Sequence, residues 1–328
     1  MLSKKNPQSY VVVFLLIFSL LLAGCAQETA EPTDTGAPKE TQDEEVQSQT
    51  PEQEEPTQPP VEEEEKIAVY ATTTTYPNLD PSASVSNENV VLANVYELLV
   101  YVNPPDSEEL LRPGLAESWE SNEEGTEWTF HLRDGVKFHD GAKLNADAVK
   151  FSIERTMEKG EGFAYIWEPV EEIVVVDDLT VRFELSRPAP LDLIAASQYA
   201  SWIFSPKSVE GKTSDWFNEG NAAGTGPYRI ESYQPGQRMI LDRFEDYWGG
   251  WKEGQLDRVV FEPVEDPTVR QQMISAGEAD ITKKVPRENL DTLNEQPGVT
   301  VYSSPSFTNL QGLLNTQKPP LDDVLVRR

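Results

Sequence analysis

The spacing of apolar and polar residues predicts a mixture of strands and helices from residue 66 onward. At residues 128–132, apolar side chains alternate with polar ones, which is the period of a half-buried strand. At residues 149–157, apolar side chains recur every four positions, so a helix is predicted there with Asn145 as its N-cap. The apolar spacing at residues 89–102 is also helical, and we expect one continuous helix over that range.

Glycine and proline positions divide the rest of this region into shorter elements. Two hairpins with turn residues at their centres are predicted at 173–185 and 228–244. Asp266 followed by Pro267 predicts the start of a helix that ends at Gly277. The remaining predicted elements are strands at 66–70, 258–264, 279–281 and 299–303, a helix near 287–294 and a helix that starts at Asp322.

The first 25 residues have the pattern of an export signal. Lys4 and Lys5 precede an apolar run at residues 10–23, which is too short to span a bilayer comfortably. The run ends in LLAGC, which is similar to a bacterial lipobox, so Cys25 is predicted to carry a lipid. We therefore expect a protein anchored to the outer face of the cell membrane, or a periplasmic one. The alternative is an uncleaved membrane anchor in which Cys25 is an ordinary buried thiol.

Residues 26–65 differ from the rest of the chain in composition. They hold 14 acidic residues against Lys39, and Val46 and Val61 are their only large apolar side chains. Such a segment buries too little surface to offset the entropy of ordering, so a disordered tether is predicted. An acidic tail that recruits a protein partner is the alternative.

The overall composition excludes several classes of function. The formal net charge of −30 argues against nucleic acid as a partner, because nucleic-acid-binding proteins present basic surfaces. One cysteine and two histidines leave little material for a metal site, and His131 and His139 fall on different predicted elements. No phosphate-binding glycine loop or nucleophile elbow is present. We therefore expect no metal, no cofactor and no enzyme activity.

Several motifs occur in an order that points to one family. They are GLAESW at 114–119, WTFHLRDGVKFHDG at 128–141, GTGPY at 224–228, DYWGG at 246–250, GEADI at 277–281 and LNTQKPPLDD at 314–323. Together they resemble the family 5 extracellular solute-binding proteins, the peptide- and nickel-type receptors of ABC importers. Most of these residues are architectural: Trp119 and Trp128 are expected in the core, and Tyr247 and Trp248 against a turn.

The resemblance implies a fold and a domain organisation. We expect an α/β protein with a type II periplasmic-binding-protein-like lobe, made of a mixed β-sheet and an inserted α/β subdomain. The solute-binding domain would occupy residues 66–328, with the first lobe at 66–102 and 203–328 and the inserted subdomain at 103–202. In the family, the second lobe follows the point where this sequence stops, so a fragment or a truncated product that lacks the second lobe is expected.

The resemblance also implies a function. Members capture a solute between two lobes and deliver it to membrane permease subunits, and an oligopeptide-like solute is the leading expectation here. The residues expected on the ligand surface are polar or aromatic and lie in or beside loops; they are Tyr76, Asn87, Trp167, Trp202 and Asn309. Ordinary surface or core packing is the alternative for each of them.

Two other functions stay open at this point. Seven tryptophans and many acidic residues would suit an exported carbohydrate-active enzyme, although no pair of carboxylates stands out for that chemistry. A surface lipoprotein that acts as an interaction or sensory module is the other. The solute is also open, because relatives of this general type handle peptides, nickel chelates, opines, haem and oligosaccharides.

Overall fold

The computed structural model describes residues 65–73, 75–104, 107–303 and 314–327. The predicted signal, the predicted tether up to residue 64, Cys25 and Asn309 lie outside the described residues. Contacts divide the chain into residues 1–61 and 62–328, and all the structure described below belongs to the second unit. None of the described helices has the length and apolar character needed to span a membrane.

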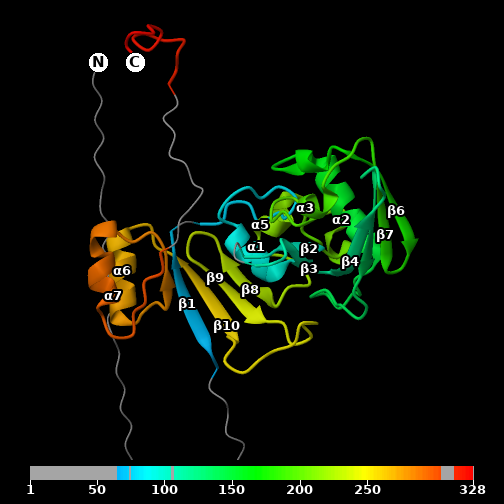
Figure 1. Ribbon diagram of the computed structural model, residues 1–328. Helices are drawn as coiled ribbons and strands as arrows, with labels where there is room; N and C mark the ends of the chain where they lie inside the picture. Colours follow the sequence, from blue (N-terminus) through cyan, green and yellow to red (C-terminus); the bar gives the residue numbers. More distant parts are fainter. Residues whose placement is uncertain (1–64, 74, 105–106, 304–313, 328) are drawn as a thin grey trace, which may run out of the picture. The chain divides into compact units, whose positions relative to one another are not determined.

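The described strands form three sheets (Figure 1). One has five strands in the order β11-β1-β10-β9-β8, one has four in the order β4-β5-β7-β6, and β2 and β3 pair alone. The strands are β1 (Ile67–Thr72), β2 (Val100–Val102), β3 (Leu111–Pro113), β4 (Ala116–Ser121), β5 (Glu127–Leu132), β6 (Val170–Asp177), β7 (Thr180–Leu185), β8 (Tyr228–Gln234), β9 (Arg238–Arg243), β10 (Arg258–Pro263) and β11 (Ile281–Thr282).

The helices are mostly short and connect or cover the strands. They are α1 (Asn89–Val95), α2 (Ala146–Lys159), α3 (Leu191–Ala195), α4 (Pro206–Val209), α5 (Ser214–Asn218), α6 (Pro267–Ala276), α7 (Leu290–Asn294) and the 3₁₀ turns η1 (Ala164–Trp167) and η2 (Arg287–Asn289).

The five-stranded sheet is mixed, as predicted. β1 runs parallel to β10 and to β11, whereas β10-β9 and β9-β8 are antiparallel pairs. The connection from β10 to β11 passes over β1 through α6, which Asp266 caps by accepting from the Thr268 and Val269 amides. Gly277 ends α6 with φ of +71°, a left-handed conformation that glycine adopts without a steric penalty.

The four-stranded sheet packs against α2. Asn145 caps this helix by accepting a hydrogen bond from the Ala148 amide at 3.0 Å, which confirms the predicted cap. One core cluster draws its buried residues from positions 99–203, and a second draws them from 76–98 and 202–261. The boundary of an inserted subdomain at 103–202 stays a prediction.

The predicted helix over residues 89–102 is wrong in its second half. α1 ends at Val95, Tyr96 is extended, and residues 100–102 form a strand instead. To continue the helix, the Val95 carbonyl would have to accept from the amide four residues later. That carbonyl instead accepts from the Gly226 amide at 3.0 Å. A Cβ on Gly224 would overlap the Val95 carbonyl, so the glycines permit the close approach that ends the helix.

Two predicted elements near the end of the chain are also wrong. Residues 299–303 form no strand, and the Val301 amide donates to the Asn294 side chain at 3.1 Å. From Asp322 the described residues form turns rather than a helix. There the Asp323 carboxylate accepts from the Leu325 amide at 2.8 Å, which is a local bond that competes with helix formation.

Candidate functional site

The carboxyl ends of β11, β1 and β10 meet at one edge of the five-stranded sheet (Figure 1). Open α/β sheets bind their ligands outside the carboxyl ends of parallel strands, at positions where the chain crosses over. The connection from β10 to β11 crosses over β1 through α6, so this edge is a position of that kind. We call the following set the carboxyl edge: Tyr70, Thr72, Tyr76, Arg270, Thr282, Lys283 and Lys284.

Backbone and side-chain hydrogen bonds hold the three strand ends in register. The Val264 amide donates to the Thr72 carbonyl at 2.9 Å, which joins the ends of β10 and β1. On the other side of β1, the Thr282 hydroxyl donates to the Ala71 carbonyl at 2.9 Å. Three segments that are distant in the sequence are therefore fixed together at this edge.

Arg270 is the most deeply buried charge of the carboxyl edge, at 2% exposed. Its Nη1 donates to the carbonyls of Val264 and Glu265 at 2.6 and 2.8 Å. Its Nη2 donates to the Lys284 carbonyl at 2.9 Å. Its Nε has no hydrogen-bond partner among the described residues, and no described carboxylate forms an ion pair with it. Arg270 thus joins the end of β10 to the segment after β11 through carbonyl oxygens.

Tyr76 lies at the same edge, as one of the predicted ligand residues. It is 3% exposed, its hydroxyl donates to the Thr72 hydroxyl at 3.3 Å, and its ring meets Phe261 edge-on. The Tyr233 hydroxyl donates to its carbonyl at 2.9 Å. Burial raises the pKa of Tyr76 to about 12, so the phenol stays protonated and acts as a neutral donor.

The other predicted ligand residues are divided between different places. Trp202 is buried in the same core cluster as Tyr76, whereas Trp167 is fully buried in the other cluster. Trp167 donates to the Ala200 carbonyl at 2.8 Å and its ring has no exposed surface for a ligand. Asn87 lies half-buried in the loop before α1, and its side chain contacts Ser86. Their ligand contacts, like that of Asn309, stay predictions.

A buried carboxylate that the sequence did not reveal lies between the two core clusters. Glu97 Oε2 accepts from Trp248 Nε1 at 2.7 Å and from the Thr225 hydroxyl at 2.8 Å. Its Oε1 accepts from the Tyr247 hydroxyl at 3.1 Å. Burial raises the pKa of Glu97, and these three donors offset part of that rise. The partners are 128 to 151 residues away, so no local pattern could have indicated this contact.

The predicted packing of Tyr247 and Trp248 is thus accompanied by specific hydrogen bonds. Trp119 and Trp128, which were predicted in the core, are partly buried and pack against the first cluster.

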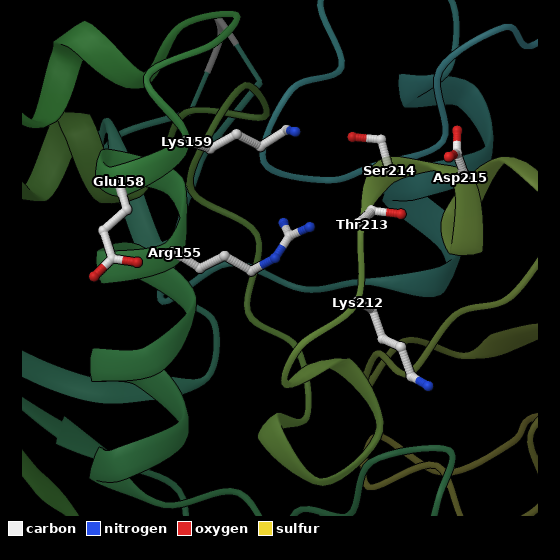
Figure 2. Close-up of a pocket in the computed structure, with 7 residues that line it drawn as sticks. All are labelled: Arg155, Glu158, Lys159, Lys212, Thr213, Ser214 and Asp215. Atoms are coloured by element: carbon white, nitrogen blue, oxygen red, sulfur yellow. The ribbon is translucent and has the colours of Figure 1, made fainter.

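A pocket of about 480 Å³ opens between α2 and the segment before α5 (Figure 2). Its lining residues are Arg155, Glu158, Lys159, Lys212, Thr213, Ser214 and Asp215. Figure 2 shows Arg155 and Lys159 extending from α2 toward Ser214. Both cations neutralise Asp80, whose side chain is fully buried: Arg155 binds it through two nitrogens at 2.8 Å each, and Lys159 lies 3.7 Å away.

Asp80, Arg155 and Lys159 form a buried ion-pair cluster that stabilises the fold. Burial acts to raise the pKa of Asp80, but the Arg155 guanidinium and the Ser82 amide outweigh it and hold the pKa below its usual range. The Ser214 hydroxyl also donates to Asp80 at 2.9 Å. These donors already occupy the Asp80 carboxylate and Arg155, so this ion pair is not available to a ligand.

The histidines form no metal or catalytic arrangement in the described part of the chain. His139 Nε2 donates to the Gly226 carbonyl at 2.9 Å, and burial lowers the pKa of His139 to about 4. His131 is 47% exposed and lies 4.0 Å from Glu120. No group of three or more metal-ligating side chains occurs among the residues that the structure describes.

Comparison with known proteins gives a consistent result. The family model "Bacterial extracellular solute-binding proteins, family 5 Middle" matches residues 111–328. The probable D,D-dipeptide-binding periplasmic protein DdpA of Escherichia coli K12 is 32% identical over 257 residues, which cover 76% of this chain and 49% of that protein. The dipeptide-binding protein of the same organism is 33% identical over 239 residues, which cover 66% and 44% of the two chains.

A solved structure extends the likeness to the fold. The solute-binding protein MoaA from A. tumefaciens R10, in complex with mannopinic acid, superimposes with a TM-score of 0.69 at 26% identity, over 80% of this chain and 54% of that one. The mixed sheets therefore belong to the type II periplasmic-binding-protein fold, as predicted. The chain spans about half the length of the relatives that it matches.

Proposed function

Because this chain belongs to the family 5 bacterial extracellular solute-binding proteins, we propose that it takes part in capturing short peptides for an ABC importer. The observation that carries the proposal is the family match over residues 111–328. Two relatives named for dipeptide binding, at 32% and 33% identity, favour a peptide over other solutes. These relatives are binding proteins rather than enzymes, so the comparisons give no support to a carbohydrate-active enzyme.

In this proposal, the carboxyl edge forms one wall of the solute site. Its strand ends are held in register by hydrogen bonds that do not depend on a ligand, so the wall is organised before a solute arrives. Preorganisation of this kind lowers the entropic cost of binding. The backbone groups at the ends of these strands would contact the peptide backbone, which is common to all peptides, and the buried Tyr76 would support them through its bond to Thr72.

The proposal extends to the location and the partners of the protein. Cys25 would carry the lipid anchor, and residues 26–65 would act as a tether of at most roughly 3 Å per residue between the membrane and the folded unit. The solute would pass to permease subunits in the same membrane. Arg155 and Lys159, which extend from α2 into the pocket of Figure 2, have no part in this step, because they pair with Asp80.

Isothermal titration calorimetry on the full chain tests the peptide assignment. The full chain is titrated with a series of dipeptides and tripeptides, with maltose, and with mannopinic acid. We expect a saturable binding heat with at least some peptides and none with maltose. Binding of maltose or mannopinic acid without binding of any peptide would overturn the assignment.

A further inference from the structure

Two consecutive lysines follow β11 at the carboxyl edge. Lys283 is half-buried and Lys284 is exposed. The whole chain carries a formal net charge of −30, so acidic partners are abundant. Within the described residues, however, no hydrogen bond or ion pair involves either ammonium group. The pair is therefore a concentration of unpaired positive charge at the edge where the proposed solute lies.

The segment that carries the pair is fixed rather than loose. β11 pairs with β1 at Tyr70 and Ala71, and the Thr282 hydroxyl donates to the Ala71 carbonyl at 2.9 Å. Lys284 has φ of +57°, a conformation that costs a residue with a side chain about 1 kcal/mol or more. The bond from buried Arg270 to the Lys284 carbonyl, at 2.9 Å, holds this conformation in place.

Two other half-buried cations among the described residues have carboxylate partners. Arg258 lies 2.6 Å from Asp242, and Arg243 lies 2.7 Å from Asp257. At Lys283, by contrast, burial lowers the pKa and the neighbouring Lys284 lowers it further, so the folded chain bears an unfavourable charge arrangement there. Local arrangements that cost stability without an internal partner are typical of functional sites.

We propose that Lys283 and Lys284 bind an acidic side chain of the solute, so that acidic peptides are the preferred class. This inference rests on the proposed function and adds the charge of the solute to it. A carboxylate beside these lysines would accept hydrogen bonds from an ammonium group, and such charge-assisted bonds are stronger than bonds between neutral groups. The terminal carboxylate is common to all linear peptides, so it cannot produce this preference.

The test compares isosteric peptides. The full chain is titrated with Ala-Glu-Ala, Ala-Gln-Ala and Ala-Lys-Ala, and with Ala-Gln-Ala amidated at its C-terminus. The same titrations are repeated on K283Q/K284Q. A matched control, K143Q/K212Q, removes two exposed lysines that also lack a described side-chain partner. Far-ultraviolet circular dichroism verifies that both variants fold.

The expected result is that Ala-Glu-Ala binds about tenfold more tightly than Ala-Gln-Ala, which is the size of one net charge-assisted hydrogen bond. This preference should disappear in K283Q/K284Q and persist in K143Q/K212Q. Equal binding of the three free peptides by the unchanged chain would overturn the inference and leave the peptide function standing. A K283Q/K284Q effect that is equal for the three free peptides and absent for the amidated peptide would also overturn it, because the lysines would then bind the terminal carboxylate. If no peptide binds at all, the inference and the proposed function both fail.

Discussion

At the junction between the two core clusters, buried Asp80 meets two cations, whereas at the carboxyl edge the cations meet only carbonyl oxygens or no described partner. Asp80 at the junction is bound by Arg155 through two nitrogens at 2.8 Å each. Arg270 at the edge is as deeply buried, at 2% exposed, but donates to three carbonyls. The first arrangement neutralises charge, whereas the second one supplies only carbonyl acceptors and leaves Nε of Arg270 without a described partner.

The difference shows which charges serve the fold alone. A buried ion that is left without a counterion costs several kcal/mol, so a folded chain normally pairs it. Asp80 follows this rule, and its position can be explained by stability. The carboxyl edge departs from it at Arg270, which only carbonyls contact, and at Lys283, which together with Lys284 is proposed to meet the solute. D80N, H139Q and E97Q change buried groups at the junction, whereas K283Q/K284Q changes the carboxyl edge.

The largest expected effect comes from breaking the junction at Asp80. D80N should lower the free energy of unfolding by about 3–5 kcal/mol, because it removes one partner of a buried ion pair and leaves Arg155 without its counterion. Urea unfolding of the full chain at pH 7, followed by tryptophan fluorescence, measures this change. E158Q removes an exposed acid from α2, the helix that carries Arg155. It should change the free energy of unfolding by less than about 0.5 kcal/mol. If D80N changed the free energy of unfolding as little as E158Q does, the ion-pair cluster around Asp80 would not have this structural role.

The elements that the sequence predicted well are those that depend on neighbouring residues. The Asn145 cap and the hairpin β6-β7 follow from local chemistry, and both are confirmed. Gly135 and Gly141 each have φ of +78°, as the Asp-Gly turns require. The predicted helix over 89–102 was wrong because Gly226, more than 120 residues away, takes the Val95 carbonyl. Local periodicity contains no information about such a contact.

The candidate site was predictable only in part, for a similar reason. Tyr76 was predicted from its residue type and its loop position, and the structure places it at the carboxyl edge. Arg270, Lys283 and Lys284 were missed because parallel pairing of β1 with β10 and β11 brings their segments together. The register of a parallel pair is set by the whole fold and not by a short sequence pattern. Trp167 is fully buried and hydrogen-bonded in the core, and its ligand contact stays a prediction.

His139 should give an effect of intermediate size that depends on pH. Its pKa in the folded chain is about 4, below the ordinary value of 6.5, so the unfolded chain takes up the proton first as the pH falls. The stability that neutral His139 contributes is therefore present above about pH 6.5 and is lost as the pH falls through about 4. The difference corresponds to about 3 kcal/mol.

Urea unfolding of the full chain between pH 7 and pH 4 measures this loss. H139Q keeps a donor for the Gly226 carbonyl but does not titrate, so its stability should fall less over this range by about that amount. H131Q changes a side chain that is 47% exposed and serves as the control. Its free energy of unfolding should fall toward acidic pH as much as that of the unchanged chain. If the free energy of unfolding fell equally with pH in H139Q and in the unchanged chain, His139 would not be desolvated in the folded state.

Glu97 should give the smallest effect and the most specific one. Its Oε2 accepts from both Trp248 and Thr225, and its Oε1 accepts only from the Tyr247 hydroxyl. A glutamine can place its oxygen at the first position and its amide nitrogen at the second, where the Tyr247 hydroxyl turns to accept. E97Q therefore keeps all three bonds and removes a buried negative charge. Its free energy of unfolding at pH 7 should be equal to that of the unchanged chain or higher by less than about 1 kcal/mol.

The direction of the pH dependence shows whether removal of the Glu97 charge stabilises the folded chain or the substitution has no effect. Because burial raises the pKa of Glu97, protonation favours the folded state, and the unchanged chain loses that advantage as the pH rises through the folded pKa. Any gain of E97Q should therefore be largest at neutral pH and shrink toward acidic pH, in the opposite sense to the His139 effect. E97A leaves three donors without an acceptor and should cost about 2 kcal/mol at every pH. If E97Q were as unstable as E97A, the carboxylate charge itself would be needed at the junction, and charge pairing there would extend from Asp80 to Glu97.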